Sequence, residues 1–185
     1  MRRIETTLPG VVLLEPHAFG DSRGFFFESY NERTFFELGI TDRFVQDNHS
    51  RSEKGVLRGL HYQIRHPQAK LCRVVQGEVL DVVLDIRLGS ATFGRHERAV
   101  LSAENRRQIY IPAGFAHGFL VLSETAEFLY KCSDFYCPEL ERGIAWNAPE
   151  IAIAWGVDRP ILSGRDSSHP RLSEVDRTDL PGLGD

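Results

Sequence analysis

The chain has 185 residues, of which 42% are hydrophobic and 26% are charged, and its formal net charge is −4. This composition is typical of one ordinary globular domain, and the mild acidity excludes the basic footprint of a nucleic-acid-binding protein. No run of about 18 apolar residues occurs, and no apolar stretch follows the basic start at residues 1–5, so neither a membrane span nor a secretory signal is expected.

The three cysteines, Cys72, Cys132 and Cys137, form an odd and sparse set. Together with the lack of a signal peptide, this set indicates reduced thiols and a cytoplasmic location. Cys132 and Cys137 have the spacing C-x4-C, but no second pair completes the four ligands of a structural zinc site. We therefore interpret all three cysteines as structural.

Short hydrophobic segments separated by Gly, Pro, Asn and Asp run along the chain and favour strands. The turn Gln76-Gly77-Glu78 predicts that residues 70–75 and 79–86 form a hairpin. Many strands with short turns are typical of a β-sandwich or a β-barrel, and the pattern alone leaves both open. In chain order, strands are predicted at 11–14, 24–30, 56–63, 70–75, 79–86, 108–111, 118–122 and 127–132.

Helix signals are weak. The best candidate spans residues 31–38, with Asn31 as its N-cap and Gly39 as its stop. We expect a single domain over residues 1–175. Residues 176–185 are polar and contain one Pro and two Gly, so they are predicted to form a flexible tail.

The predicted strand 79–86 has two different faces. On one face, alternate residues are all aliphatic, which predicts burial in a core. The other face alternates Val79 and Val83 with Asp81 and Asp85. The simpler interpretation of the two acidic residues is an ordinary solvated face. The alternative is that this face lines the interior of a barrel that contains a polar site.

One segment that combines glycine with titratable groups is VLRGLHYQ at residues 56–63. In a regular strand, Arg58 and His61 would point to opposite faces. A bulge at Gly59 would bring both side chains to one side. Taken alone, however, a histidine on a strand is more often structural than catalytic.

Two further segments carry groups that can transfer protons. IPAGFAHGF at 111–119 delivers His117 from a turn to the start of a strand. EFLYK at 127–131 contains Tyr130, which shares strand parity with aromatic neighbours and so predicts a core position. A tyrosine donates protons in catalysis when its hydroxyl reaches a cavity. Each signal is weak by itself.

Eight segments, taken in order and spacing, resemble one family from about residue 4 to residue 170. They are FGDSRGFFFESYN at 19–31, FVQDNHSRS at 44–52, VLRGLHYQ at 56–63, KLCRVVQGEVLDVVLDIR at 70–87, TFG at 92–94, LSAENRRQIYIPAGFAHGFLVLSE at 101–124, EFLYK at 127–131 and IAWN at 144–147. They are similar to the dTDP-4-dehydrorhamnose 3,5-epimerases, which are isomerases. The resemblance implies a mainly β fold, the cupin-type jelly-roll β-barrel, with a few short helices.

The resemblance also implies catalytic roles for residues that match the family's motifs. His61 resembles the catalytic base, and Asp166 resembles the acidic group that orients this base. Tyr130 resembles the proton donor on the opposite face of the sugar. Lys70 resembles the group near the ketone oxygen.

Other matching residues resemble the family's substrate contacts. Arg58 and His117 match residues that contact the sugar and the diphosphate. Phe135 occupies a nucleobase-stacking position where Tyr is common in the family, and we expect stacking to persist with one hydroxyl fewer. The family implies a homodimer, in which the nucleotide-side residues reach in part into a neighbouring subunit; these are Phe19, Arg23, Glu28, Gln46 and Asn48.

The reaction implied by the resemblance converts dTDP-4-dehydro-6-deoxy-D-glucose to dTDP-4-dehydro-L-rhamnose. C3 and C5 both adjoin the C4 ketone, so loss of either proton gives an enolate, and return of a proton to the other face inverts the carbon. A histidine base, a cation at the developing oxyanion and an acid on the opposite face meet these needs. Because neither redox chemistry nor an electron sink is required, no cofactor is expected.

Metal-binding cupins carry an H-x-H pair followed by an acidic residue and a later histidine. Here no histidine stands two positions after His61, and only the later motif with His117 is present. No metal site is therefore predicted, which weakens the alternative of an iron-dependent cupin dioxygenase. The remaining alternatives are an epimerase that acts at C3 or C5 only, and a non-catalytic cupin that binds a sugar nucleotide. The joint presence of a base and an opposed acid argues against the last.

Overall fold

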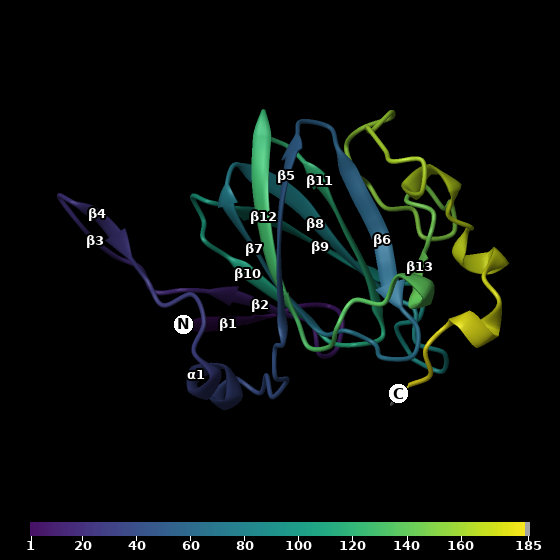
Figure 1. Cartoon of the computed structure of the whole chain (residues 1–185), viewed down its shortest axis with the longest axis horizontal. Helices are drawn as coiled ribbons and strands as arrows, with labels where there is room; N and C mark the ends of the chain where they lie inside the picture. Colours follow the sequence, from purple (N-terminus) through teal and green to yellow (C-terminus); the bar gives the residue numbers. More distant parts are fainter. Residues whose placement is uncertain (184–185) are drawn as a thin grey trace.

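Two antiparallel sheets face each other in the computed structural model, which describes residues 1–183 (Figure 1). In spatial order, the six-stranded sheet contains β1 (Arg2–Glu5), β2 (Val12–Glu15), β10 (Gln108–Ile111), β7 (Lys70–Gln76), β12 (Thr125–Cys132) and β5 (Gln46–Glu53). The five-stranded sheet contains β13 (Glu141–Gly143), β6 (Leu57–Gln63), β11 (Phe115–Val121), β8 (Glu78–Asp85) and β9 (His96–Ser102). The predicted cupin-type jelly roll is confirmed, and hydrogen bonds between the described strands leave the two sheets separate rather than closed into one barrel.

The helices are few and short, as predicted. They are α1 (Glu32–Glu37) and the 3-10 helices η1 (Pro138–Leu140), η2 (Asp166–Ser168), η3 (Leu172–Glu174) and η4 (Arg177–Asp179). The side chain of Asn31 caps the backbone N–H groups of Arg33 and Thr34, and the chain leaves the helix through Gly39 in a left-handed conformation. Among the described residues, no helix is long and apolar enough to cross a membrane.

The connection at Gly77 does not form the predicted hairpin. β7 pairs with β10 and β12 in one sheet, whereas β8 pairs with β11 and β9 in the other. The hairpin prediction was wrong because both edges of β8 already have partners within its own sheet. The turn instead carries the chain from one sheet to the other, with Gly77 at φ +74°.

Large apolar side chains of both sheets fill the space between them. Phe119 on β11 and Phe128 on β12 are both buried, and their rings stack with centroids 4.2 Å apart. This contact joins β11, the middle strand of the five-stranded sheet, to β12, which lies next to the edge strand β5 of the six-stranded sheet. It therefore helps to set the distance between the sheets on either side of the site described below.

The acidic face of β8 is also part of the interior. Asp81 and Asp85 are both fully buried, so the interpretation of a solvated face was wrong, and this face lies in the interior between the two sheets. The alternating pattern suggested solvent exposure, but each carboxylate has a partner inside the fold, and this pairing lowers the free-energy cost of burying it. Asp81 pairs with His117, and Asp85 pairs with Arg87.

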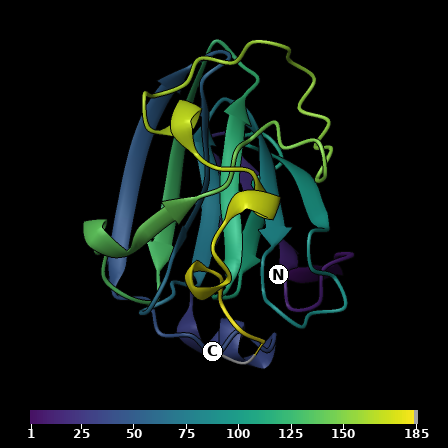
Figure 2. The ribbon, with the colours of Figure 1, turned by 90° about the vertical axis from the view of Figure 1, so that its right-hand side faces the viewer.

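The segment from residue 144 to residue 183 covers the outer face of the five-stranded sheet. Ile144, Ile151, Trp155 and Leu172 pack there against aliphatic residues of β6, β8 and β11, and Figure 2 shows this segment crossing in front of the strands. Within the segment predicted to be a flexible tail, η4 forms, Leu180 is buried and Gly182 bridges to residue 88. Residues 184–185 of that prediction lie outside the described residues.

A hairpin of β3 (Phe19–Asp21) and β4 (Gly24–Phe26) projects away from both sheets (Figure 1). The predicted strand at 24–30 is therefore shorter than expected, since regular pairing ends at Phe26. Three aromatic side chains on this arm are at least 60% exposed: Phe19, Phe25 and Phe26. Such a cluster is typical of a surface that meets another molecule.

Candidate active site

A bulge in β6 places two of the predicted site residues on one side of the strand. His117 and Phe119 of β11 lie opposite His61 and Arg58 of β6, so β6 contains one extra residue between the two pairs. Gly59 has φ +118°, and a Cβ on it would lie 2.6 Å from the Cα of Gly118. The two glycines thus allow the close backbone approach that the bulge needs, as the position of Gly59 predicted.

A cavity of about 400 Å³ lies between the two sheets and gathers most of the predicted site residues. Strands β5, β7 and β12 provide one wall, strands β6 and β11 provide the other, and η2 adds an acidic group. The predicted residues that line this cavity are Gln46, Asn48, Arg58, His61, Lys70, His117, Tyr130 and Asp166. We refer to it as the central cavity.

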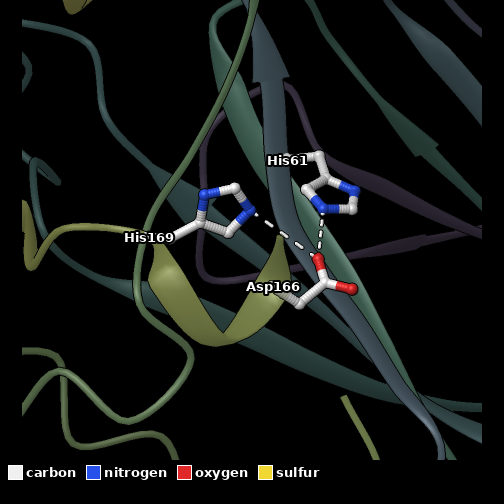
Figure 3. Close-up of side chains that lie close together, drawn as sticks. All are labelled: His61, Asp166 and His169. Carbon is white, nitrogen blue, oxygen red and sulfur yellow. Dashed lines mark hydrogen bonds and ion pairs between the residues drawn. The ribbon is translucent and has the colours of Figure 1, made fainter. Parts of the chain in front are cut away.

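His61 and Asp166 form a hydrogen-bonded pair at the central cavity, which we call the dyad (Figure 3). Nε2 of His61 lies 2.5 Å from Oδ1 of Asp166, which leaves Nδ1 of the imidazole for another partner. The other oxygen of Asp166 accepts a hydrogen bond of 2.7 Å from the Ser163 hydroxyl, and the Gly59 amide donates to Oδ1 at 3.3 Å. The carboxylate is thus held in one orientation toward the imidazole.

The environment of Asp166 keeps this carboxyl group ionised. Burial alone would raise its pKa, but the imidazoles of His169 and His61 and the hydroxyl of Ser163 together hold the pKa of Asp166 well below its usual range. An ionised partner stabilises the imidazolium that forms when His61 takes up a proton. The dyad is therefore suited to act as a general base.

A second histidine–aspartate pair includes His117, which lines the same cavity. Nε2 of His117 lies 2.9 Å from Oδ2 of Asp81, and both side chains are buried. The other oxygen of Asp81 has no hydrogen-bond partner among the described residues. The pairing fixes the orientation of the His117 ring, which lines the cavity beside Arg58.

Tyr130 and Lys70 come from the sheet opposite the dyad. Tyr130 lies on β12, and Lys70 starts the neighbouring strand β7. Burial, with smaller contributions from the thiols of Cys132 and Cys72, raises the pKa of Tyr130 to about 12. The phenol is therefore protonated at neutral pH and can donate its proton into the cavity.

Four predicted substrate contacts do not line the central cavity of the single chain. Phe19 and Arg23 lie on the projecting hairpin, where Arg23 pairs with Asp21. Glu28 accepts hydrogen bonds from the side chains of Asn31 and Thr34 at the start of α1. The fourth, Phe135, is 65% exposed.

Three residues near the dyad were not predicted from the sequence. Tyr136, the neighbour of Phe135, lines the cavity and donates a hydrogen bond of 2.6 Å to Glu141. Oε1 of Glu141 lies 3.9 Å from Nδ1 of His61, and His169 lies behind Asp166. These residues stand in short or irregular elements, where no periodic pattern indicates which way a side chain points.

His61, Asp166 and His169 are the one group of side chains among residues 1–183 with the composition and proximity of a metal site, since one ligand atom of each lies within 4.8 Å of the others. Two ligands of one tetrahedral zinc ion stand roughly 3.3 Å apart, given metal–ligand bonds near 2.0–2.1 Å. The 2.5 Å between His61 and Asp166 is too short for that arrangement and fits a shared proton. As arranged, the three side chains fit a hydrogen-bonded dyad better than a metal centre.

A jelly roll of two sheets that holds a dyad, a lysine and an opposed tyrosine around one cavity defines an acid–base enzyme of the cupin type. The model of the dTDP-4-dehydrorhamnose 3,5-epimerase family matches residues 5–174. The chain belongs to this family.

Individual relatives agree with this assignment. The dTDP-4-dehydrorhamnose 3,5-epimerase of Pseudomonas aeruginosa is 58% identical over 178 residues, which cover 95% of this chain and 98% of that protein. A second relative is dTDP-6-deoxy-D-glucose-3,5-epimerase RmlC from Legionella pneumophila Philadelphia 1, whose crystal structure was solved in complex with dTDP-4-keto-L-rhamnose. Its sequence is 50% identical, and the two structures superpose with a TM-score of 0.96 over 100% of this chain and 99% of that one. ChmJ, a 3'-monoepimerase from Streptomyces bikiniensis solved with dTDP-quinovose, is 36% identical with a TM-score of 0.89, over 95% and 91% of the two chains.

Proposed function

We propose that the chain converts dTDP-4-dehydro-6-deoxy-D-glucose to dTDP-4-dehydro-L-rhamnose by inverting C3 and C5. The observation that carries this proposal is the placement of a base and an acid on opposite walls of one cavity. His61 with Asp166 belongs to the side of the five-stranded sheet, and Tyr130 belongs to the six-stranded sheet. An inversion requires removal of a proton from one face and delivery to the other.

In the proposed first step, His61 removes a proton from a carbon next to the C4 ketone. Because Nε2 faces Asp166, Nδ1 is the nitrogen that accepts the proton. The C3 and C5 hydrogens of the D-gluco ring lie on the same face, so one base serves both carbons in turn. A positioned base of this kind contributes about 10²- to 10⁴-fold to the rate.

The electron pair released from the C–H bond moves onto the ketone oxygen and forms an enolate. Lys70 is the proposed cation at this oxygen, where one such interaction contributes about 10²- to 10³-fold. Tyr130 then delivers its proton to the opposite face of the carbon and regains a proton from water, while His61 releases its proton to water. The same sequence at the second carbon completes the reaction, and no cofactor is required.

The remaining side chains of the central cavity are proposed to hold the substrate. Arg58 and His117 lie beside each other and are suited to the sugar and the diphosphate. Gln46 and Asn48 line the cavity from β5 and present amide groups for the nucleotide side. Tyr136 supplies an aromatic ring at the cavity, next to the position where stacking by Phe135 was expected.

We propose that the enzyme is a homodimer in which the projecting hairpin reaches the partner. The exposed aromatic rings of Phe19, Phe25 and Phe26 support this assembly, because isolated chains rarely leave such rings uncovered. Phe19 and Arg23, with Glu28 just beyond the hairpin, would then complete the nucleotide side of the other subunit's cavity. A cytoplasmic location is proposed with it and is supported by three unpaired thiols.

An epimerase that acts at a single carbon is the second candidate. The similarity to the 3'-monoepimerase ChmJ supports keeping it, because the same fold hosts that activity. Identities of 50% and above to proteins named as 3,5-epimerases favour the double inversion.

Proton NMR of the substrate incubated with chelator-treated enzyme in D2O tests the proposal. Deuterium at both C3 and C5 is expected, and a 4-keto reductase with NADPH should then trap dTDP-L-rhamnose. Deuterium at one carbon only would favour the single-centre enzyme, and no exchange by protein that still binds dTDP would favour a non-catalytic cupin.

A matched pair of variants ties the exchange to the dyad. His61→Asn should abolish exchange at both carbons. His66→Asn alters a histidine that pairs with Asp134 at 3.3 Å outside the cavity and should leave exchange unchanged. His66 has φ +63°, a left-handed conformation that asparagine adopts readily.

A further inference from the structure

His169 is a buried histidine behind the dyad. It follows η2, and its ring meets that of His61 edge to face, with centroids 5.5 Å apart and an interplanar angle of 81°. Its side chain is only 8% exposed. Figure 3 shows the two imidazoles on either side of the Asp166 carboxylate.

The fold makes specific room for this ring. Gly143 lies directly opposite His61 in the pairing of β13 with β6. A Cβ at Gly143 would lie 2.4 Å from Nε2 of His169 and 2.5 Å from two of its ring carbons. Gly143 has no left-handed φ, so its lack of a side chain is explained by the imidazole that fills the space.

The nitrogen Nε2 of His169 has one acceptor nearby, which is the carboxylate of Asp166. Nε2 lies 3.7 Å from Oδ1 of Asp166, the oxygen that also faces His61, and it has no hydrogen-bond partner within residues 1–183. Leaving a buried polar atom unpaired is costly. His169 does not line the central cavity but a neighbouring one of about 460 Å³, so we expect no direct contact between His169 and the substrate.

We infer that His169 is a positioning residue: Nε2–H donates to Oδ1 of Asp166 and holds the carboxylate in line with His61 during proton transfer. A shift of less than 1 Å would close the gap from 3.7 Å to an ordinary hydrogen bond. Ser163 already fixes the other oxygen, so the two donors together would stop the carboxylate from rotating. The inference rests on the function proposed above.

Two substitutions of His169 distinguish the hydrogen bond that its Nε2–H donates from the packing of its ring. His169→Phe keeps a planar ring in the space above Gly143 but removes the donor, whereas His169→Gln keeps a donor near the position of Nε2. We expect His169→Phe to lower kcat about five- to tenfold, as loss of one hydrogen bond predicts, with KM unchanged. His169→Gln should recover most of that loss. Equal defects in both variants, or wild-type kcat in His169→Phe, would overturn the inference.

A third variant tests the position of the ring while keeping the histidine. Gly143→Ala places a methyl group where the imidazole now lies, so the ring must leave its present position beside Asp166. We expect a loss of kcat similar to that of His169→Phe, in protein whose thermal unfolding shows that it is folded. An unchanged kcat in folded Gly143→Ala would count against the inference.

NMR of the full chain with 15N-labelled histidine gives a readout that needs no turnover. The Nε2–H proton of His61 should resonate at low field, because this nitrogen lies 2.5 Å from Oδ1 of Asp166. His169→Phe should move this resonance, and His169→Gln should restore it. A lack of epimerisation by the wild-type enzyme would contradict the proposed function. An unmoved resonance in His169→Phe would contradict the inference about His169, whether or not the enzyme turns over.

Discussion

Nε2 of His61 and Oδ1 of Asp166 lie 2.5 Å apart although 105 positions separate the two residues in the chain. His61 lies on β6, and Asp166 is brought to it by the C-terminal segment that covers the outer face of the same sheet. The dyad therefore forms only when this segment has packed. Formation of the dyad thus depends on apolar contacts in the covering layer, such as those of Trp155.

Asp166→Asn tests the ionised partner of the base. The amide keeps the shape of the side chain but cannot stabilise the imidazolium and favours the wrong tautomer of His61. We expect exchange at C3 and C5 to fall by about 10²- to 10⁴-fold with little change in KM. Asp134→Asn, at the exposed pair with His66, is the control and should retain full activity. Less than a tenfold loss in Asp166→Asn would argue against the dyad as the base.

Tyr130→Phe tests the opposed acid. Because the pKa of Tyr130 is raised to about 12, we expect it to contribute no alkaline limb to the rate up to pH 10. Without the hydroxyl, His61 should still exchange protons for deuterium, while the yield of inverted product falls sharply. Tyr110→Phe, at a buried tyrosine bonded to Asp42, should lower stability and leave the product unchanged. Normal inversion by Tyr130→Phe would assign the acid to another group.

Lys70→Met tests the cation at the enolate oxygen. Loss of one group that stabilises a developing oxyanion predicts a decrease in kcat of about 10²- to 10³-fold. Lys131→Met removes a lysine that pairs with Asp47 at 2.9 Å outside the central cavity and should have little effect. The measurement is the ratio of kcat in Lys131→Met to kcat in Lys70→Met. A ratio near one would show that Lys70 has no role in the mechanism.

Asp85→Asn tests a buried carboxylate away from the chemistry. Burial opposes its ionisation, but Arg87, Thr92 and Ser90 outweigh burial and lower the pKa of Asp85 to about 2. Removing this charge should cost about 3 kcal/mol of unfolding free energy at pH 7, because Arg87 is left unpaired.

The same variant has a defined pH dependence. Since the folded pKa lies below the ordinary value of 3.8, the charge stabilises the fold above about pH 4, and this stabilisation is lost as the pH falls toward 2. The difference in urea stability between wild type and Asp85→Asn should therefore shrink by about 2 kcal/mol over that range. A difference that stays constant with pH would show that Asp85 is not held ionised.

Chelation tests whether the cluster of His61, Asp166 and His169 works without metal. The short contact within the dyad fits a proton, so we expect activity to be unchanged after dialysis against EDTA. Loss of activity that a single divalent metal restores would replace the dyad with a metal centre. Metal analysis of the active protein is the accompanying measurement.

Local pattern predicted eight of the strands, the capped helix and the bulge at Gly59, because each depends on neighbouring residues. It missed the strands β1, β3, β5, β9 and β13. It did not predict that β7 and β8 join different sheets, since a two-sheet crossing and a hairpin use the same turn residues. Nor did it predict the burial of Asp81, because its partner His117 is distant in sequence. The pairing of His61 with Asp166 was predicted only from the family resemblance. No sequence pattern indicated that His169 would lie beside this pair.

The stack of Phe119 on Phe128 has a consequence for stereochemistry. Phe119 lies beside His117 and Arg58 on one wall, and Phe128 contacts Tyr130 on the other, with ring centroids 6.0 Å apart. In the proposed mechanism, the thickness of this aromatic layer sets the distance between the wall that carries the base and the wall that carries Tyr130. The dimensions of the core would therefore affect which stereoisomer the enzyme forms. A repacked core should change the ratio of singly to doubly inverted sugar before it weakens binding.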